Sequence, residues 1–168
     1  YAETMAWLEK LVAAAPELEM LTIAESLEGR AIGMVIASAE SQFTPAAMRS
    51  GGKPLVLVQA GIHAGEIDGK DAGLMLLRDM TVGARRKDLL RYVNLLFIPI
   101  LNVDGHERVS PYNRINQRGP EQMGWRTNAR NQNINRDYTK LDTLEARAVV
   151  QVINRWRPDL YLDLHVTD

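Results

Sequence analysis

The sequence predicts an α/β fold in which a mixed β-sheet is flanked by helices. Two observations lead to this prediction. Apolar runs of strand length alternate along the chain with longer segments whose apolar residues recur at helical spacing. The chain also has no internal repeats, low-complexity tracts or linkers, and its 168 residues are enough for one domain to bury a core. We therefore expect residues 1–168 to belong to a single domain.

The first third of the chain predicts a helix followed by a hairpin. Residues 2–14 place apolar side chains on one helical face, and a proline ends the pattern. Residues 21–24 and 31–37 have the composition of two strands. The turn between these strands is expected at Glu28-Gly29.

The middle of the chain predicts a loop, a buried strand and a helix. Residues 39–53 contain a proline and paired glycines and are expected to form a loop. The continuous apolar run at residues 55–59 is typical of a strand that is covered on both faces. Residues 67–80 follow as an amphipathic helix. Its predicted inward side chains are Leu74, Met75 and Leu77.

The remainder predicts two more strands, one helix and a long polar segment. Residues 92–98 and 160–164 are apolar runs, and the second is expected to be buried in the centre of the sheet, beside strand 55–59. Residues 143–156 show helical spacing. Residues 102–140 are polar, and a structureless segment of this length inside a compact domain is uncommon and usually functional.

Composition excludes several classes of site. The absence of cysteine rules out disulfides, cysteine-type zinc sites and thiol catalysis, although it leaves the compartment open. A net charge of −1 gives no general attraction to nucleic acid or membranes. No apolar run approaches the roughly 18 residues of a membrane-spanning helix. The chain begins at Tyr1, which is compatible with a removed signal peptide, and a secreted or periplasmic location is slightly favoured over a cytoplasmic one.

The most informative pattern is a His-x-x-Glu pair followed much later by a second His. His63 and Glu66 follow the apolar run 55–59, and two side chains three residues apart at the start of a helix can point to one place. His165 follows the run 160–164. Two strands that end side by side would unite two imidazoles and one carboxylate, which is a donor set of catalytic zinc. Taken singly, each residue has a plainer interpretation, as a surface pair or a hydrogen-bonded core histidine.

The polar segment 102–140 carries a second set of candidates, its arginines. Guanidinium groups suit the bidentate capture of carboxylates and the stabilisation of a developing oxyanion. Arginines next to a metal centre would therefore favour a substrate with an anionic end. Most of them are expected to be solvated or structural, although one could line the site. The arginines of the segment are Arg108, Arg114, Arg118, Arg126, Arg130 and Arg136.

Six short segments occur in a fixed order along residues 20–168. They are Glu25-Ser-Leu-Glu-Gly-Arg30-Ala-Ile32, Gly61-Ile-His63-Ala-Gly-Glu66, Pro99-Ile-Leu-Asn102-Val-Asp104-Gly105, Trp125-Arg126, Asn133-Ile-Asn135-Arg136 and Pro158-Asp-Leu-Tyr-Leu-Asp-Leu-His165. Jointly they resemble the signatures of the zinc carboxypeptidase A-like family, the M14 metallopeptidases. Each segment is weak alone, and their common order makes the pattern specific. The resemblance implies a zinc carboxypeptidase-like fold, of the phosphorylase/hydrolase-like kind.

The resemblance also implies the roles of the main site residues. His63, Glu66 and His165 would hold a zinc ion, and Arg126 would stabilise the oxyanion. The family's general-base Glu, its mobile substrate-binding Tyr and the residue that sets side-chain preference lie downstream of its third metal ligand. We therefore expect residues 1–168 to be the first part of a catalytic domain, truncated after that ligand.

The sequence departs from the family pattern in the polar segment. Where members commonly have an Asp that orients a zinc-bound His, this chain has Asn133, so that role is expected to fall to Asp163 or Asp104. Asp137-Tyr138 stands where many members have Asn and an aromatic residue, which leaves the substrate subsite open. Val103 stands where Pro is usual.

The predicted function is that of a zinc-dependent metallocarboxypeptidase, which hydrolyses a C-terminal peptide bond through a metal-activated water. The resemblance implies that Asn135 and Arg136 hold the free carboxylate of a peptide or of a peptide-like wall fragment. Glu107 and Glu121 are candidates for the general base by residue type only. His106 is expected to lie at the surface, outside the site.

Three alternatives remain open on the sequence alone. An N-acyl amino acid deacylase of the aspartoacylase/succinylglutamate desuccinylase type shares the His-x-x-Glu and His scaffold. A non-catalytic module could use the same cleft to bind carboxylate ends. A nucleic-acid binder is disfavoured by the net charge of −1 and by the few aromatic residues among the arginines. The expected partner is therefore a carboxylate-bearing substrate, with no nucleic acid and no membrane span.

Overall fold

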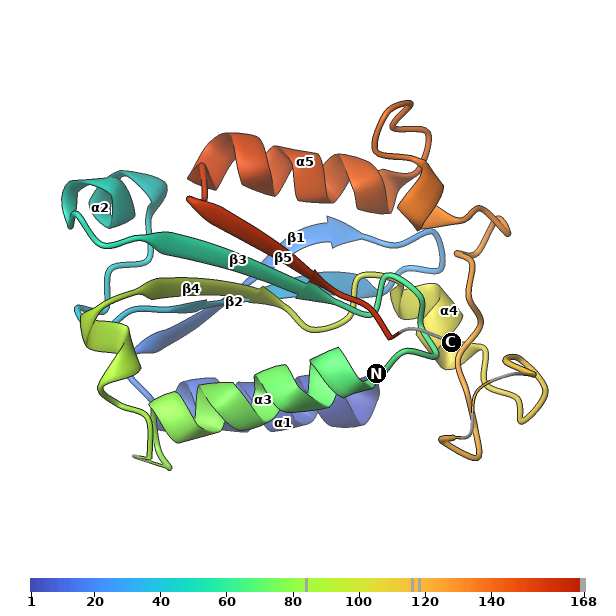
Figure 1. Ribbon diagram of the computed structural model, residues 1–168, viewed down its shortest axis with the longest axis horizontal. Coiled ribbons are helices and arrows are strands. Elements are labelled where there is room, and N and C mark those ends of the chain that lie inside the picture. Colours follow the sequence, from blue (N-terminus) through green and yellow to red (C-terminus); the bar gives the residue numbers. More distant parts are fainter. Residues whose placement is uncertain (84, 116, 118, 167–168) are drawn as a thin grey trace.

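A five-stranded mixed sheet lies between two layers of helices in the computed structural model, which describes residues 1–83, 85–115, 117 and 119–166 (Figure 1). The strand order is β1-β2-β4-β3-β5. The first three strands in this order pair antiparallel, whereas β3 pairs parallel with both β4 and β5. This confirms the predicted fold class. The strands are β1 (Leu18–Glu25), β2 (Ala31–Ala37), β3 (Leu55–Ala60), β4 (Asn94–Ile98) and β5 (Leu160–Leu164).

Helices cover both faces of the sheet. α1 (Ala2–Ala14) and α3 (Asp68–Met80) lie together on one face, and α5 (Leu144–Trp156) lies on the other (Figure 1). A six-residue helix, α2 (Pro45–Ser50), precedes β3 on the same face as α5. The helices predicted at residues 2–14, 67–80 and 143–156 are thus confirmed to within one residue at each end. None of the described helices is long and apolar enough to cross a bilayer.

The continuous apolar runs of the central strands follow from this layered packing, because successive residues of a strand point to opposite faces. In β2, Met34 packs in a cluster with Val149 of α5. Its neighbour Val35 packs in a second cluster with Leu8 of α1 and Leu77 of α3. A strand that feeds two cores carries no polar alternation, so its sequence is apolar throughout.

The predicted loop at residues 39–53 is partly wrong, because it contains α2. Thr44 caps this helix by accepting a hydrogen bond from the Ala47 N–H through its side chain, and Pro45 occupies the first helical turn. Thr-Pro before a short apolar stretch is a helix-start signal. The nearby glycines obscured it, since they indicate irregular structure.

The prediction of which α3 side chains point inward is also partly wrong. Leu77 and Met80 are fully buried against the sheet, and Leu74 is partly buried. Met75, in contrast, is 56% exposed. One residue corresponds to 100° around a helix, so Met75 cannot share the face defined by its neighbour Leu74 and by Leu77.

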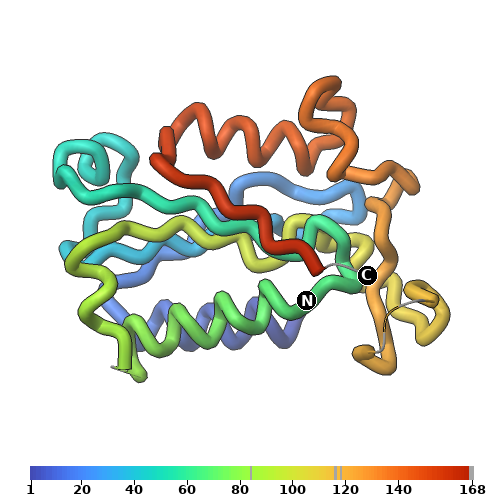
Figure 2. The backbone as a smooth tube through the Cα atoms, viewed as in Figure 1, coloured from blue at the N-terminus to red at the C-terminus, as the bar shows by residue number. Residues whose placement is uncertain are grey.

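The long polar segment runs past the end of the sheet. Figure 2 shows its second part, in orange, beside the end of β5. The segment contains α4 (Val103–Glu107) and the 3₁₀ turn η2 (Ile134–Arg136), and a further 3₁₀ turn, η1 (Leu89–Arg91), precedes β4. Between α4 and η2, side chains replace regular structure as hydrogen-bond partners: the Asn128 side-chain oxygen accepts from two backbone N–H groups, those of Arg130 and Gln132.

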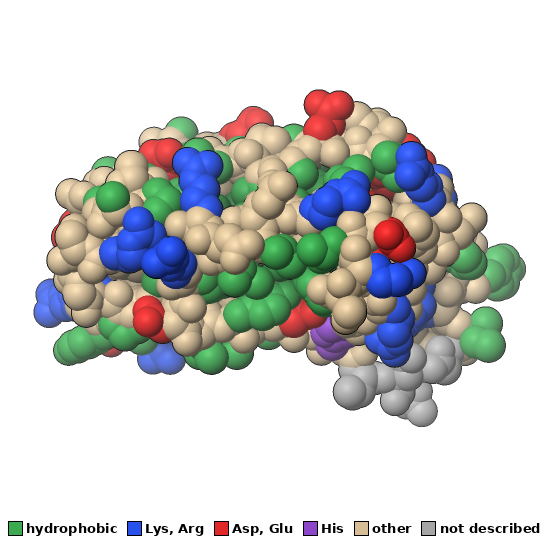
Figure 3. Space-filling view, turned by 90° about the horizontal axis from the view of Figure 1, so that it is seen from above, with side chains coloured by type: hydrophobic (Ala, Val, Ile, Leu, Met, Phe, Trp, Pro, Cys, Tyr) green, Lys and Arg blue, Asp and Glu red, His purple; other side chains and the backbone are tan. Residues whose placement is uncertain are grey.

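The final strand, β5, does lie beside β3, but it is not central. Within the described residues it forms the edge of the sheet, and Leu160 and Leu162 are 50% and 41% exposed. Figure 3 shows a band of hydrophobic side chains, in green, across one face of the molecule. The prediction of a buried central strand is therefore wrong for these residues. An apolar run indicates that a strand has apolar neighbours, but it does not tell from which part of the chain they come.

Candidate metal centre

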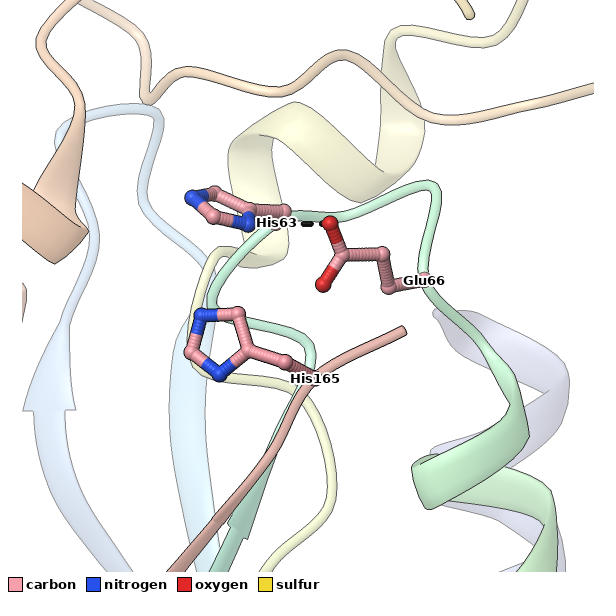
Figure 4. Close-up of side chains that lie close together, drawn as sticks. All are labelled: His63, Glu66 and His165. Atoms are coloured by element: carbon pink, nitrogen blue, oxygen red, sulfur yellow. Dashed lines mark hydrogen bonds and ion pairs between the residues drawn. The ribbon is translucent and has the colours of Figure 1, made fainter. Parts of the chain in front are cut away.

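The three predicted ligands meet at the carboxyl ends of two parallel strands (Figure 4). β3 and β5 pair with Ala60 opposite Leu164, so His165 leaves β5 beside the turn that follows β3. In that turn, the Glu66 N–H donates to the His63 carbonyl oxygen over 3.0 Å. The turn brings His63 and Glu66 to the same side just before α3 begins. The sequence expectation that both strands deliver ligands to one place is thus met.

The donor atoms of these residues form a compact group. One ligand atom from each of the three lies within 4.8 Å of the others, and His63 Nδ1 is 3.0 Å from Glu66 Oε1. The two imidazole rings have centroids 5.0 Å apart and are inclined by 76°. Two donors bound to one zinc ion are separated by on the order of 4 Å or less, since each bond is about 2.0–2.2 Å. Small side-chain rotations would therefore suffice, and the donor set fits zinc.

Glu66 is ionised in this setting. Burial by itself raises the pKa of the Glu66 carboxyl, but hydrogen bonds from His63, from the Val166 N–H and from Arg114 outweigh burial and lower the pKa to about 2. Only 2% of the Glu66 side chain is exposed. A buried carboxylate that stays charged near neutral pH is a suitable ligand for a divalent cation.

Asn133 and Asn135 each contact one of the two imidazoles. His63 Nε2 lies 3.2 Å from Asn133 Oδ1, so the ring can donate there while Nδ1 faces Glu66. His165 Nε2 lies 3.0 Å from Asn135 Nδ2. The outer nitrogen of a metal-binding imidazole usually donates to an oxygen, which fixes the orientation of the ring, and Asn133 offers such an oxygen to His63. The Asn135 amide nitrogen is itself a donor, so His165 Nε2 would accept from it.

Asp163 and Asp104 were the two acids expected to orient a zinc-bound His in place of the missing Asp. For Asp104 this prediction is wrong. Asp104 is completely buried in α4, where it accepts hydrogen bonds from Ser26 and Arg30. Asp163 does lie near the centre, with Oδ1 3.5 Å from His165 Nδ1. Burial raises the pKa of Asp163, and the neighbouring His165 opposes that shift. The neutral Asn133 thus contacts His63 at the position where family members commonly have an Asp.

Replacing Asn133 by alanine is expected to lower the zinc affinity of the protein by about 10- to 100-fold, the usual cost of losing an outer partner of a metal-bound imidazole. Asn133→Asp should restore binding, because a carboxylate also accepts from His63. Asn154→Ala, on an exposed position of α5, is the matched control. Zinc affinity measured by competition with a chelator checks the prediction. Equal affinities in Asn133→Ala and Asn154→Ala would contradict it.

Arg126 lies beside the centre, held there by α4. Its Nη1 is 3.6 Å from Glu66 Oε1, and its side chain is 37% exposed. Asn102 caps α4 and donates to the Arg126 carbonyl oxygen. Gly105 accepts a hydrogen bond from the Trp125 N–H, and a Cβ at Gly105 would lie 2.5 Å from the Trp125 carbonyl oxygen. The Asn-Val-Asp-Gly turn therefore places Arg126, because only glycine lets segment 125–127 approach so closely.

Arg114 is the site residue that the sequence interpretation missed. The sequence alone groups it with the structural arginines, yet its side chain is 5% exposed and donates from Nη1 to Glu66 Oε1 over 3.0 Å. A Cβ at Gly65 would lie 3.2 Å from Arg114 Cγ, so the absence of a side chain there makes room for the guanidinium stem. Glycine between the ligands His63 and Glu66 was the one available signal. It could not show which arginine would use the space.

The other candidates fall into different places. Arg136 is exposed, bonds to the Asn135 carbonyl oxygen, and lines a cavity of about 230 Å³ that it shares with Asn133. Glu107 is paired with the Tyr1 amino group and with His106, which is only partly exposed. The remaining candidates touch none of the three ligands in any described contact, or lie outside the described residues in the case of Arg118. They are Arg108, Arg118, Arg130 and Glu121.

Asp137 and Tyr138, which stand at the substrate subsite that the sequence left open, make structural contacts. Asp137 accepts hydrogen bonds from the Asp142 N–H and from both the N–H and the hydroxyl of Thr143, which caps α5. Burial raises the Asp137 pKa, but these bonds outweigh burial and lower it. The Tyr138 hydroxyl lies within hydrogen-bonding distance of Gln59 and of the Tyr161 hydroxyl. Together they fix η2, and with it Asn135, against the sheet.

The fold and the centre define an α/β protein with a candidate zinc site at the ends of parallel strands. A sequence profile described as zinc carboxypeptidase, peptidase family M14, matches residues 4–168. The chain belongs to the zinc carboxypeptidase family. A direct comparison with curated protein sequences gives no match.

Solved structures of carboxypeptidases share the fold at low sequence identity. A metallo-carboxypeptidase from Burkholderia cenocepacia has 20% identity and a TM-score of 0.75, over 99% of this chain and 40% of its own. Carboxypeptidase A from Helicoverpa armigera has 21% identity and a TM-score of 0.75, over 100% and 46%. A metallo-carboxypeptidase from Pseudomonas aeruginosa, in complex with (2-guanidinoethylmercapto)succinic acid, has 22% and 0.73, over 99% and 39%. The chain thus spans less than half the length of these structures.

Proposed function

We propose that this protein is a zinc-dependent metallocarboxypeptidase, which hydrolyses the C-terminal peptide bond of peptides or peptide-like molecules. The observation that carries the proposal is the convergence of His63, Glu66 and His165 at the ends of β3 and β5, in a chain of the zinc carboxypeptidase family. Family membership supports this function over an N-acyl amino acid deacylase, and turnover separates it from a non-catalytic carboxylate-binding module.

Each residue of the centre would have a distinct role in catalysis. Zinc bound here would lower the pKa of a coordinated water to about 7 and polarise a carbonyl group. His63 and His165 would each donate an imidazole nitrogen, and Glu66 its carboxylate. Arg126, partly exposed beside Glu66, would stabilise the negative charge that develops on the carbonyl oxygen.

The residue that accepts the proton of the attacking water is proposed to lie outside residues 1–168. Glu107 is occupied by the Tyr1 amino group and His106, and Glu121 makes none of the described contacts with the three ligands. Glu66 is itself held by Arg114 and His63. We therefore assign none of these carboxylates to general-base catalysis.

Asn135 and Arg136 would bind the terminal carboxylate of the substrate. The Asn135 side chain touches His165, so the pair lies on the imidazole side of the centre. Arg136 is exposed and bonded only to the backbone oxygen of Asn135 among its described contacts, which leaves guanidinium nitrogens to receive an anion. A carboxylate fixed there would place the last peptide bond next to the metal ligands.

The proposal is tested with three matched substrates and the intact protein. A peptidase of this kind is expected to release the last residue of a peptide with a free C terminus, to spare the amidated peptide, and to leave an N-acyl amino acid intact. Chelation should abolish turnover, and added zinc should restore it. Hydrolysis of the N-acyl amino acid alone would favour the deacylase. Zinc-dependent binding of the free peptide without turnover would favour the binding module.

A further inference from the structure

A cavity adjoins the candidate centre on the side of Glu66. Its volume is about 500 Å³, and it is lined by segment 112–115 and by segment 125–127. Two of its lining residues are Arg114 and Arg126, whose guanidinium groups lie 3.0 Å and 3.6 Å from Glu66 Oε1. The cavity is therefore adjacent to the centre, because Arg114 and Arg126 line it and also contact Glu66.

The wall of this cavity carries large apolar side chains that lie outside the hydrophobic core. Tyr112, Ile115 and Trp125 are 84%, 97% and 38% exposed, and all three line the cavity. None of them belongs to either of the two core clusters or packs against them. Single exposed apolar side chains are ordinary, but three around one concave surface next to a candidate active site indicate a binding surface.

The charges of the cavity restrict what can occupy it. Arg114 and Arg126 contribute two guanidinium groups that share a single carboxylate, that of Glu66, and none of the described lining residues is acidic. A cationic side chain would meet like charge there, whereas an aliphatic or aromatic side chain would be covered by Tyr112, Ile115 and Trp125. The chemistry of the wall therefore favours an uncharged apolar group.

The position of the cavity relative to the centre tells which part of a substrate would reach it. Asn135, next to Arg136, touches His165, whereas Arg126 and the cavity lie beside Glu66. A peptide whose terminal carboxylate is held by Arg136 would cross the three ligands toward Arg126. The residue that contributes the scissile carbonyl would then place its side chain in the cavity.

We propose that this cavity is an apolar subsite for the side chain of the substrate residue that precedes the scissile bond. The proposal rests on the proposed carboxypeptidase function and adds a substrate class to it: peptides whose penultimate residue is aliphatic or aromatic, and not basic. The subsite is made by the exposed segment 112–115 together with Trp125.

The test compares blocked tripeptides with a free C terminus, using the intact protein. The penultimate residue is glycine, leucine, phenylalanine or lysine, and a second series carries the same changes one residue earlier. For the wild type, kcat/KM is expected to be about tenfold higher with leucine or phenylalanine than with glycine at the penultimate position. Lysine should be no better than glycine, and the second series should show no such preference.

Two variants and one control assign the preference to the cavity. Tyr112→Ser and Ile115→Ser alter exposed side chains, so the fold should tolerate them, and each should reduce the tenfold preference to within about twofold. Tyr92→Ser is the matched control, because Tyr92 is 71% exposed and precedes β4, at the opposite end of the sheet. It should keep the wild-type preference.

The outcomes separate the subsite from the function. If no peptide is bound or cleaved, the proposed function fails and the subsite falls with it. If peptides are cleaved with equal kcat/KM for glycine and phenylalanine, the function stands and the subsite is overturned. The subsite is likewise overturned if the preference appears one residue earlier, or if Tyr112→Ser and Ile115→Ser both leave it unchanged.

Discussion

Replacing either His63 or His165 by alanine is expected to remove zinc from the protein. Each substitution deletes one of three protein ligands, so the affinity should fall by more than the roughly 100-fold that loss of an outer partner can cost. Zinc content after dialysis against a weak chelator measures the effect. The wild type should retain about one zinc per chain, and both variants should retain almost none.

His106→Ala is the control for these substitutions. His106 lies in α4, hydrogen-bonded to Glu107 and close to the Tyr1 amino group, and it touches none of the three ligands in a described contact. Its replacement should leave the zinc content unchanged. If His63→Ala and His165→Ala both bound as much zinc as the wild type, the centre would be misassigned, even with the side chains as close as they are.

The second large effect concerns the substrate carboxylate. Arg136→Ala is expected to cost about 2–5 kcal/mol in kcat/KM for a peptide with a free C terminus, because a bidentate, charge-assisted contact is lost. Activity on the amidated peptide, which has no carboxylate, should change little. Comparison of the two substrates in wild type and variant isolates the contribution of the carboxylate contact.

Arg155→Ala provides a matched loss of an exposed arginine away from the centre, near the end of α5. It should leave the preference for the free C terminus intact. A wild-type enzyme that cleaves free and amidated peptides equally well would refute the exopeptidase assignment. A preference that survives Arg136→Ala would move carboxylate binding to another residue.

Most of the architecture could be predicted because burial on both faces leaves a strong mark on the sequence. β2, β3 and β4 are largely apolar, with Gln59 and Asn94 as the polar exceptions, and α5 begins after a Thr that caps it. The position of β5 at the edge of the described sheet could not be predicted, since an apolar run carries no information about which strand lies on each side. The short helix α2 was missed because its signal spans only Thr44 and Pro45.

The centre was predictable to the extent that its residues occupy fixed places in the chain. His63, Glu66 and His165 stand directly after strands or at a helix start, and their convergence follows from parallel pairing of β3 with β5. Arg114 had no such mark, because it reaches Glu66 from an irregular segment. The contact of Asn133 with His63 was not predicted, because an acid was expected as the partner of the imidazole. An amide oxygen accepts the same hydrogen bond.

The arrangement of the ligands also bears on the stability of β5. Within the described residues this strand is hydrogen-bonded to the sheet along one side only, through β3. A metal shared by Glu66 and His165 would be a reversible cross-link between points about 100 residues apart in the chain. By analogy with a disulfide, closing such a loop restricts the unfolded chain by on the order of 4–5 kcal/mol. The bound ion would then tie the end of β5 to the turn that follows β3, as well as serve the reaction.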